Sequence, residues 1–100
     1  MLDERRADFQ RLNARVEGMV QGVGFRAFVE QAAIARGLTG WVRNRWDGTV
    51  ELAAEGPRPD LEDLLRVIRR GPRASTVRSV QIEWQTASNE FTGFMIRRTD

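Results

Sequence analysis

The chain has 100 residues, which is the size of a single domain and leaves no room for a second core. It contains no cysteine and no histidine, which excludes disulfides, thiolate metal sites and the most common general base. Its 16 basic residues are all arginine and oppose 14 acidic ones, so the net charge of +2 favours neither strong DNA binding nor attraction to a membrane. No apolar run reaches the ~20 residues of a membrane helix, and the N-terminal sequence lacks the apolar region of a signal peptide. We therefore expect a cytoplasmic location.

The first half of the chain predicts a strand, a glycine turn and a helix. Residues 1–11 are highly charged, and we expect a flexible lead-in to a domain that spans 12–100. Alternation of Val16, Gly18 and Val20 predicts a strand over 14–21. A helix is expected over 25–36, because its apolar residues have the spacing of one buried stripe. These residues are Phe25, Phe28, Val29, Ala32 and Ala33. Gly37 suits the left-handed position after a helix, and Leu38 can pack back onto it.

The second half predicts a hairpin, a second helix and two more strands. Strands over 40–45 and 49–55 flank the hairpin signal Asp47-Gly48. Asp60 is a candidate N-cap for a helix that ends near residue 70. The inward side chains of this helix are expected to be Leu61, Leu64, Leu65 and Ile68. A strand over 77–85 and a short strand over 94–97 complete the chain.

This order of elements predicts an α+β fold, a ferredoxin-like βαββαβ sandwich with a short extra C-terminal strand. Right-handed crossovers give an antiparallel sheet of strand order 4-1-3-2, with two helices on one face. The first and second strands then run in the same direction with the third between them. Their C-terminal ends share one rim of the sheet, roughly 10 Å apart.

Three features meet on this rim and point to an anion site. Gly22 and Gly24 allow the turn "QGVGF" to direct several backbone N–H groups into one concavity at the start of a helix. Arg26 adds a planar, bidentate donor suited to phosphate or carboxylate. Asn44, 18 residues further along, should face Arg26 and can hold a water in a fixed orientation. Taken singly, the glycines could simply form a turn, Arg26 could be a surface charge and Asn44 a residue of the hairpin. Only their combination on one rim predicts an anion site.

The stretches "VEGMVQGVGFR" (16–26) and "GLTGWVRNRWDGTVE" (37–51) resemble the two signature sequences of the acylphosphatase family. Weaker similarity extends the match to about residues 12–97. Arg36, Ser75 and the absence of a C-terminal tyrosine depart from the family pattern, but they lie away from the rim. The resemblance implies the ferredoxin-like fold and the hydrolysis of acyl phosphates to carboxylate and phosphate without a cofactor. It also implies that Arg26 is the catalytic arginine and Asn44 the catalytic asparagine.

The resemblance leads to a mechanistic hypothesis that suits a chain without histidine. The leaving carboxylate departs without protonation, so positioning and charge stabilisation are sufficient. The N–H groups of the loop would bind the phosphoryl oxygens, and Asn44 would orient the attacking water, with no metal and no covalent intermediate. The expected phosphate-binding residues are Gln21, Gly22, Val23, Gly24, Phe25 and Arg26. We expect a monomer with a small acyl phosphate as substrate, phosphate as product or inhibitor, and no nucleic-acid or membrane partner.

Two other functions are weighed against hydrolysis. "QGVGFRAF" superficially resembles an RNA-recognition motif, but such a motif belongs on the third strand, and "TVELAAE" there has no aromatic residue. A binding module that keeps the anion loop without turnover is the second, since longer carbamoyl-transfer proteins contain acylphosphatase-like domains. Trp46, beside Asn44, would either influence substrate choice or lie over the hairpin.

Overall fold

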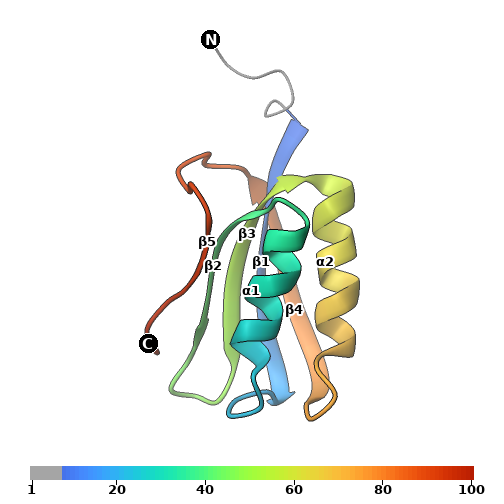
Figure 1. Ribbon diagram of the computed structural model, residues 1–100, viewed down its shortest axis with the longest axis vertical. Coiled ribbons are helices and arrows are strands. Elements are labelled where there is room, and N and C mark those ends of the chain that lie inside the picture. The colour runs from blue at the N-terminus through green and yellow to red at the C-terminus, as the bar shows by residue number, and fades with distance from the viewer. Residues whose placement is uncertain (1–7) are drawn as a thin grey trace.

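The computed structural model describes residues 8–100, which form one five-stranded sheet covered on one face by two helices (Figure 1). The elements are β1 (Phe9–Met19), α1 (Phe25–Ala35), β2 (Thr39–Asn44), β3 (Val50–Pro57), α2 (Arg58–Arg70), β4 (Thr76–Thr86) and β5 (Phe94–Ile96). The sheet order β4-β1-β3-β2-β5 confirms the predicted 4-1-3-2 arrangement and places the short extra strand beside β2. No helix within residues 8–100 is long and apolar enough to cross a membrane.

The last strand differs from the expected antiparallel sheet, because β5 runs parallel to β2. The other three strand pairs are antiparallel, as predicted. The reason is the path of the chain: β4 and β5 lie on opposite edges of the sheet, and the connection over 87–93 crosses one end of the sheet between them (Figure 1). The chain therefore re-enters the sheet in the direction of β2.

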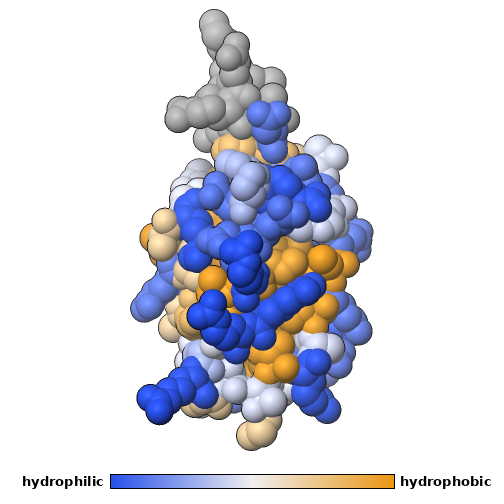
Figure 2. All heavy atoms as spheres, turned by 90° about the vertical axis from the view of Figure 1, so that its right-hand side faces the viewer, coloured by the Kyte–Doolittle hydropathy of each residue, from blue (hydrophilic) through white to orange (hydrophobic). Residues whose placement is uncertain are grey.

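The hydrophobic core lies between the sheet and the two helices, as the helical stripes predict. In α1 the residues Phe25, Val29 and Ala33 are buried, and in α2 all four expected residues are buried. Helix α1 ends as the glycine predicts. Gly37 has a φ of 67°, its N–H donates to the carbonyl of Ile34, and the N–H of Leu38 donates to that of Ala33. Toward α2 and β4 the surface shows hydrophobic side chains between hydrophilic ones (Figure 2), and half-buried Val77 and Val80 of β4 pack against the core.

Two predicted boundaries are wrong. Helix α2 begins at Arg58 with Pro57 as its N-cap, so Asp60 lies in the first turn and does not cap the helix. The cause is Pro59, whose fixed φ fits the first turn of a helix. Strand β1 begins at Phe9, because residues 9–11 pair with residues 55–57 of β3, so this part of the expected lead-in belongs to the sheet. The rest of the lead-in, residues 1–7, lies outside the described residues.

The direction of the strands brings the predicted site residues to one end of the sheet. Both β1 and β2 pair antiparallel with β3, so they run in the same direction on either side of it. The connection from β1 to α1 and the turn from β2 to β3 therefore lie at the same end, as Figure 1 shows. This arrangement confirms the shared rim that the sequence predicts.

Candidate active site

A cavity of about 220 Å³ lies at this rim, between the end of β1, the first turn of α1, the end of β2 and β5. Arg26 and Asn44 both line it, which confirms that the fold brings them together across β3. The full lining is Val20, Gly22, Gly24, Phe25, Arg26, Ala27, Asn44 and Ile96. Arg26 is the one charged residue in this set, so the lining has a positive charge and no carboxylate.

The loop between β1 and α1 has the backbone shape of an anion site. Gly22 and Gly24 have φ values of 74° and 77°, in the left-handed region that side-chain-bearing residues rarely adopt. A Cβ atom on either glycine would meet nothing within 4 Å, so the backbone conformation, and not lack of space, requires glycine here. Gly24 is the N-cap of α1 and makes no side-chain capping bond. The N–H groups of the first helical turn therefore remain available, and the helix dipole adds partial positive charge.

Four of the six expected phosphate-binding residues line the cavity, and two do not. Gly22, Gly24, Phe25 and Arg26 belong to the lining. The side chain of Gln21 instead bridges to the β2–β3 turn, where its Nε2 donates to the carbonyl of Arg45 at 2.7 Å and to that of Thr49 at 2.9 Å. Val23 packs against the hydrophobic core. The side chains of these two residues therefore support the loop from outside the cavity.

Asn44, a lining residue of the cavity, has an unsatisfied polar atom. Its Oδ1 atom is buried and has no hydrogen-bond partner among the described residues. A buried polar atom without a partner is uncommon and indicates a site for a water or a ligand. The backbone of Asn44 is held in place, because its carbonyl accepts the N–H of Asp100 at 3.1 Å and the residue pairs with Val50 of β3. The side chain is thus carried by a fixed strand end.

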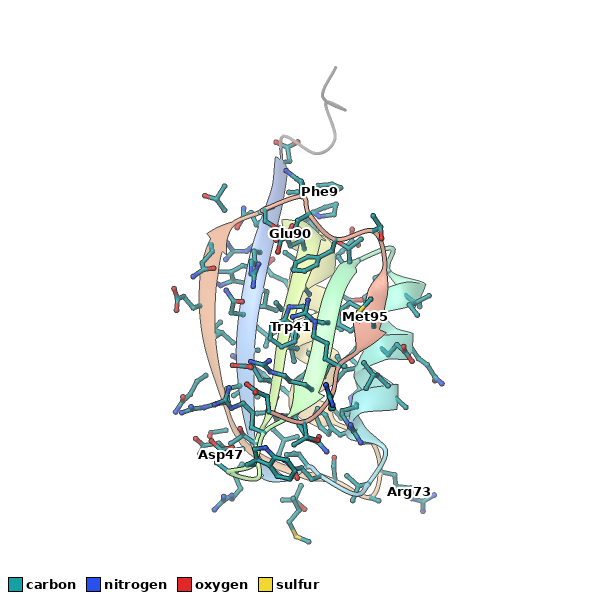
Figure 3. The ribbon with its side chains drawn as sticks, turned by 90° about the vertical axis from the view of Figure 1, so that its left-hand side faces the viewer. Phe9, Trp41, Asp47, Arg73, Glu90 and Met95 are labelled. Atoms are coloured by element: carbon teal, nitrogen blue, oxygen red, sulfur yellow. The ribbon has the colours of Figure 1, made fainter. Side chains whose placement is uncertain are left out.

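A second, larger hollow of about 660 Å³ lies on the sheet, and it is a weaker candidate. Trp41 is among its lining residues, and Figure 3 shows this side chain in the middle of the sheet. The polar groups around it satisfy one another. Asn13 donates to Gln85 at 2.8 Å, and Arg43 pairs with a carboxylate oxygen of Glu51 at 2.7 Å. Because these groups already have partners, the smaller cavity has the better chemistry for binding an anion.

Sequence reasoning missed Ile96 and left the position of Trp46 open. Ile96 lines the cavity from β5, and only the parallel pairing of β5 with β2 brings it there. Trp46 is 84% exposed and does not line the cavity. Within residues 8–100 no group of three or more acidic side chains is arranged to hold a metal ion.

The comparisons with known proteins point to one family. The family model described as Acylphosphatase matches residues 12–96. An acylphosphatase of Salinibacter ruber is 47% identical over 89 residues, which cover 89% of this chain and 94% of the relative. The solved structure of an acylphosphatase from Coxiella burnetii has a TM-score of 0.88 at 32% identity and covers 96% of this chain and all of that one. The crystal structure of acylphosphatase from Bacillus subtilis has a TM-score of 0.85 at 38% identity and covers 88% of this chain and 98% of that one. The chain therefore belongs to the acylphosphatase family, enzymes that hydrolyse the carboxyl–phosphate bond of acyl phosphates.

Proposed function

We propose that this acylphosphatase binds the phosphoryl group of its substrate in the loop over 21–26 and hydrolyses it with Arg26 and Asn44. One observation carries the proposal: both side chains line a single cavity together with the glycines of the loop. Arg26 comes from the first turn of α1 and Asn44 from the end of β2, so their meeting is a property of the fold and not of sequence proximity.

The chemistry requires little from the protein besides positioning and positive charge. The oxygen of a water attacks phosphorus, the bond from phosphorus to the acyl oxygen breaks, and its electron pair leaves with the carboxylate. The proton of the water passes to a phosphate oxygen. Because a carboxylate with a pKa of about 4 leaves without protonation at neutral pH, no general acid is needed. A site without histidine is therefore sufficient for this leaving group.

The loop and Arg26 stabilise the charge on the phosphoryl oxygens. The backbone N–H groups of the loop and the guanidinium of Arg26 would donate to these oxygens from the cavity lining, and donors that the fold already positions need little rearrangement as charge develops. Loss of one such donor typically lowers kcat by about 10²–10³-fold. Arg26 carries a full charge in addition, so its removal is expected to reach at least this range.

Asn44 orients the attacking water. Its buried Oδ1 has no partner among the described residues and would accept a hydrogen bond from the water, while its Nδ2 group can donate to the water or to the phosphate. Asn44 has no basicity, so its contribution is orientation, which acts on kcat more than on KM.

Benzoyl phosphate hydrolysis, measured with a chelator present, tests the proposal. The wild type is expected to turn over, Arg26→Gln to lose at least about 10²-fold in kcat/KM, and Asn44→Ala to lose kcat with a smaller change in KM. Arg73→Gln, an exposed arginine outside the cavity, serves as the matched control and should retain activity. Wild-type kcat in Asn44→Ala would refute the role of Asn44. A folded wild type that binds phosphate without turnover would favour the binding-module function instead.

Several finer properties belong to the same proposal. Metal independence is supported by the leaving-group chemistry and is tested by the chelator. The absence of a nucleic-acid partner is supported by the low net charge of +2 and by the lack of aromatic residues in β3. A salt-dependent RNA-binding titration tests it, and gel filtration tests the expected monomer. The cytoplasmic location remains a prediction from the sequence.

A further inference from the structure

We propose that Ile96 of β5 forms an acyl-group subsite at the mouth of the cavity and favours substrates with a bulky apolar acyl group. This inference rests on the proposed function and extends it to the part of the substrate that leaves. The polar groups of the lining are the loop N–H groups, Arg26 and Asn44, and the phosphoryl group and the water occupy them. The remaining lining residues are apolar and are available to the acyl group.

Among these apolar residues Ile96 has the right combination of position and exposure. Val20 and Phe25 are each 1% exposed and belong to the buried floor of the cavity. Ile96 is 40% exposed although it lines the same cavity, and Ala27 on the first turn of α1 is also exposed. Ile96 and Ala27 are therefore the apolar side chains of the lining that an acyl group extending toward solvent can cover. Covering the exposed part of Ile96 would then contribute binding free energy.

The fold explains why an isoleucine on an edge strand faces the site. Along a strand successive side chains point to opposite faces, so Ile96 points to the same face as buried Phe94, and Met95 points to the other. Figure 3 labels Met95, the neighbour of Ile96 on β5, which does not line the cavity. Ile96 is paired in register with Val42, two residues before Asn44 on the neighbouring strand. It therefore lies next to the site through pairing of β5 with β2.

The test compares two acyl phosphates that differ in the size of the acyl group. Ile96→Thr keeps a β-branched side chain but replaces apolar surface by a hydroxyl. For benzoyl phosphate we expect kcat/KM to fall roughly three- to tenfold, which is the range expected from covering part of one isoleucine side chain. For acetyl phosphate we expect a change of less than about twofold, because a single methyl group covers little of that surface. Inhibition by inorganic phosphate should be unchanged, and Ile96→Val should retain most of the preference.

The matched control is Ile82→Thr, since Ile82 is an isoleucine of similar exposure, 38%, on β4 at the other edge of the sheet. It should leave the ratio of the two substrates unchanged. Equal losses for both substrates in Ile96→Thr, or weaker inhibition by phosphate, would show that Ile96 supports the phosphate site and would overturn the inference. Wild-type kcat/KM for both substrates in Ile96→Thr would overturn it as well. Failure of the wild type to hydrolyse either substrate would instead refute the proposed function.

Discussion

Replacing Gln21 by methionine tests whether the loop over 21–26, the proposed phosphate site, is held in place from outside the cavity. Methionine has nearly the same length and shape but no donor, so Gln21→Met removes the two hydrogen bonds from Nε2 to the carbonyls of Arg45 and Thr49. A neutral hydrogen bond contributes about 1 kcal/mol net, and the exposed position lets water replace part of it. We expect a loss of roughly 1–2 kcal/mol in the free energy of unfolding. For a domain of this size the Tm should fall by roughly 5–10 °C.

The same substitution should slow catalysis, because Arg45 directly follows Asn44 and its carbonyl is one of the two anchor points. Without Gln21 the β2–β3 turn would be less restrained, and the side chain of Asn44, at the end of β2, would hold its proposed position toward the water less well. We expect kcat to fall roughly three- to tenfold, with a smaller change in KM, since misplacement of a positioning group acts mainly on the transition state.

Urea unfolding and steady-state hydrolysis of benzoyl phosphate measure the two effects. Gln31→Met on α1 is the matched control, since Gln31 is exposed, lies outside the cavity, and glutamine and methionine have similar helix propensities. It should change neither quantity appreciably. A lower free energy of unfolding with wild-type kcat would show that Asn44 does not depend on Gln21 for its position. Wild-type values of both would refute the reasoning altogether.

Two further predictions concern stability. Glu55 is 1% exposed, and its carboxylate accepts hydrogen bonds from the N–H groups of Ser88 and Asn89 and from the hydroxyl of Ser88. Glu55→Gln replaces one of the acceptor oxygens by a donor. It should lower the free energy of unfolding, measured by urea titration, by roughly 1–3 kcal/mol. A wild-type midpoint would contradict this. The hydrogen bond from Arg36 holds the pKa of Asp63 below its ordinary value of 3.8. A depressed pKa stabilises the folded state at neutral pH, and this stabilisation is lost as the pH falls below about 3.8 through the folded pKa. The difference in free energy of unfolding between the wild type and Asp63→Asn should therefore shrink in that pH range. A difference that stays constant down to about pH 2 would exclude the linkage.

The helices, the sheet order and the shared rim could be predicted because each leaves a local or topological signal in the sequence. The buried stripe of α1 and the glycine after it are contained in 14 consecutive residues, 25–38, and the structure confirms both. The meeting of Arg26 and Asn44 follows from right-handed crossovers and not from any property of the two residues alone. The order of the elements is therefore enough to predict that these two residues lie at the same end of the sheet.

The role of Gln21 and the position of Ile96 could not be predicted in this way. Strand β1 ends at Met19, so the alternation of side chains along a strand does not place Gln21, whose side chain reaches the β2–β3 turn. β5 has only three residues, too few for a pattern that specifies its partner. Its place beside β2 depends on contacts such as that of Glu55 with Ser88, 33 residues apart, and long-range contacts of this kind have no local signature.

The composition of the cavity implies that contacts outside it hold the loop in position. The proposed phosphate site depends on backbone N–H groups and so requires a fixed loop, yet two of its residues are glycines, which have the most conformational freedom in an unconstrained chain. Contacts behind the loop supply the constraint. Gln21 ties it to the β2–β3 turn, and buried Phe25 lies so close to Gly71, after α2, that a Cβ there would approach its ring to 3.2 Å. A loop that is restrained by contacts on two sides can hold its N–H groups in one orientation without histidine, a metal or a covalent bond to the substrate. Residues that never touch the substrate should therefore control kcat in this enzyme.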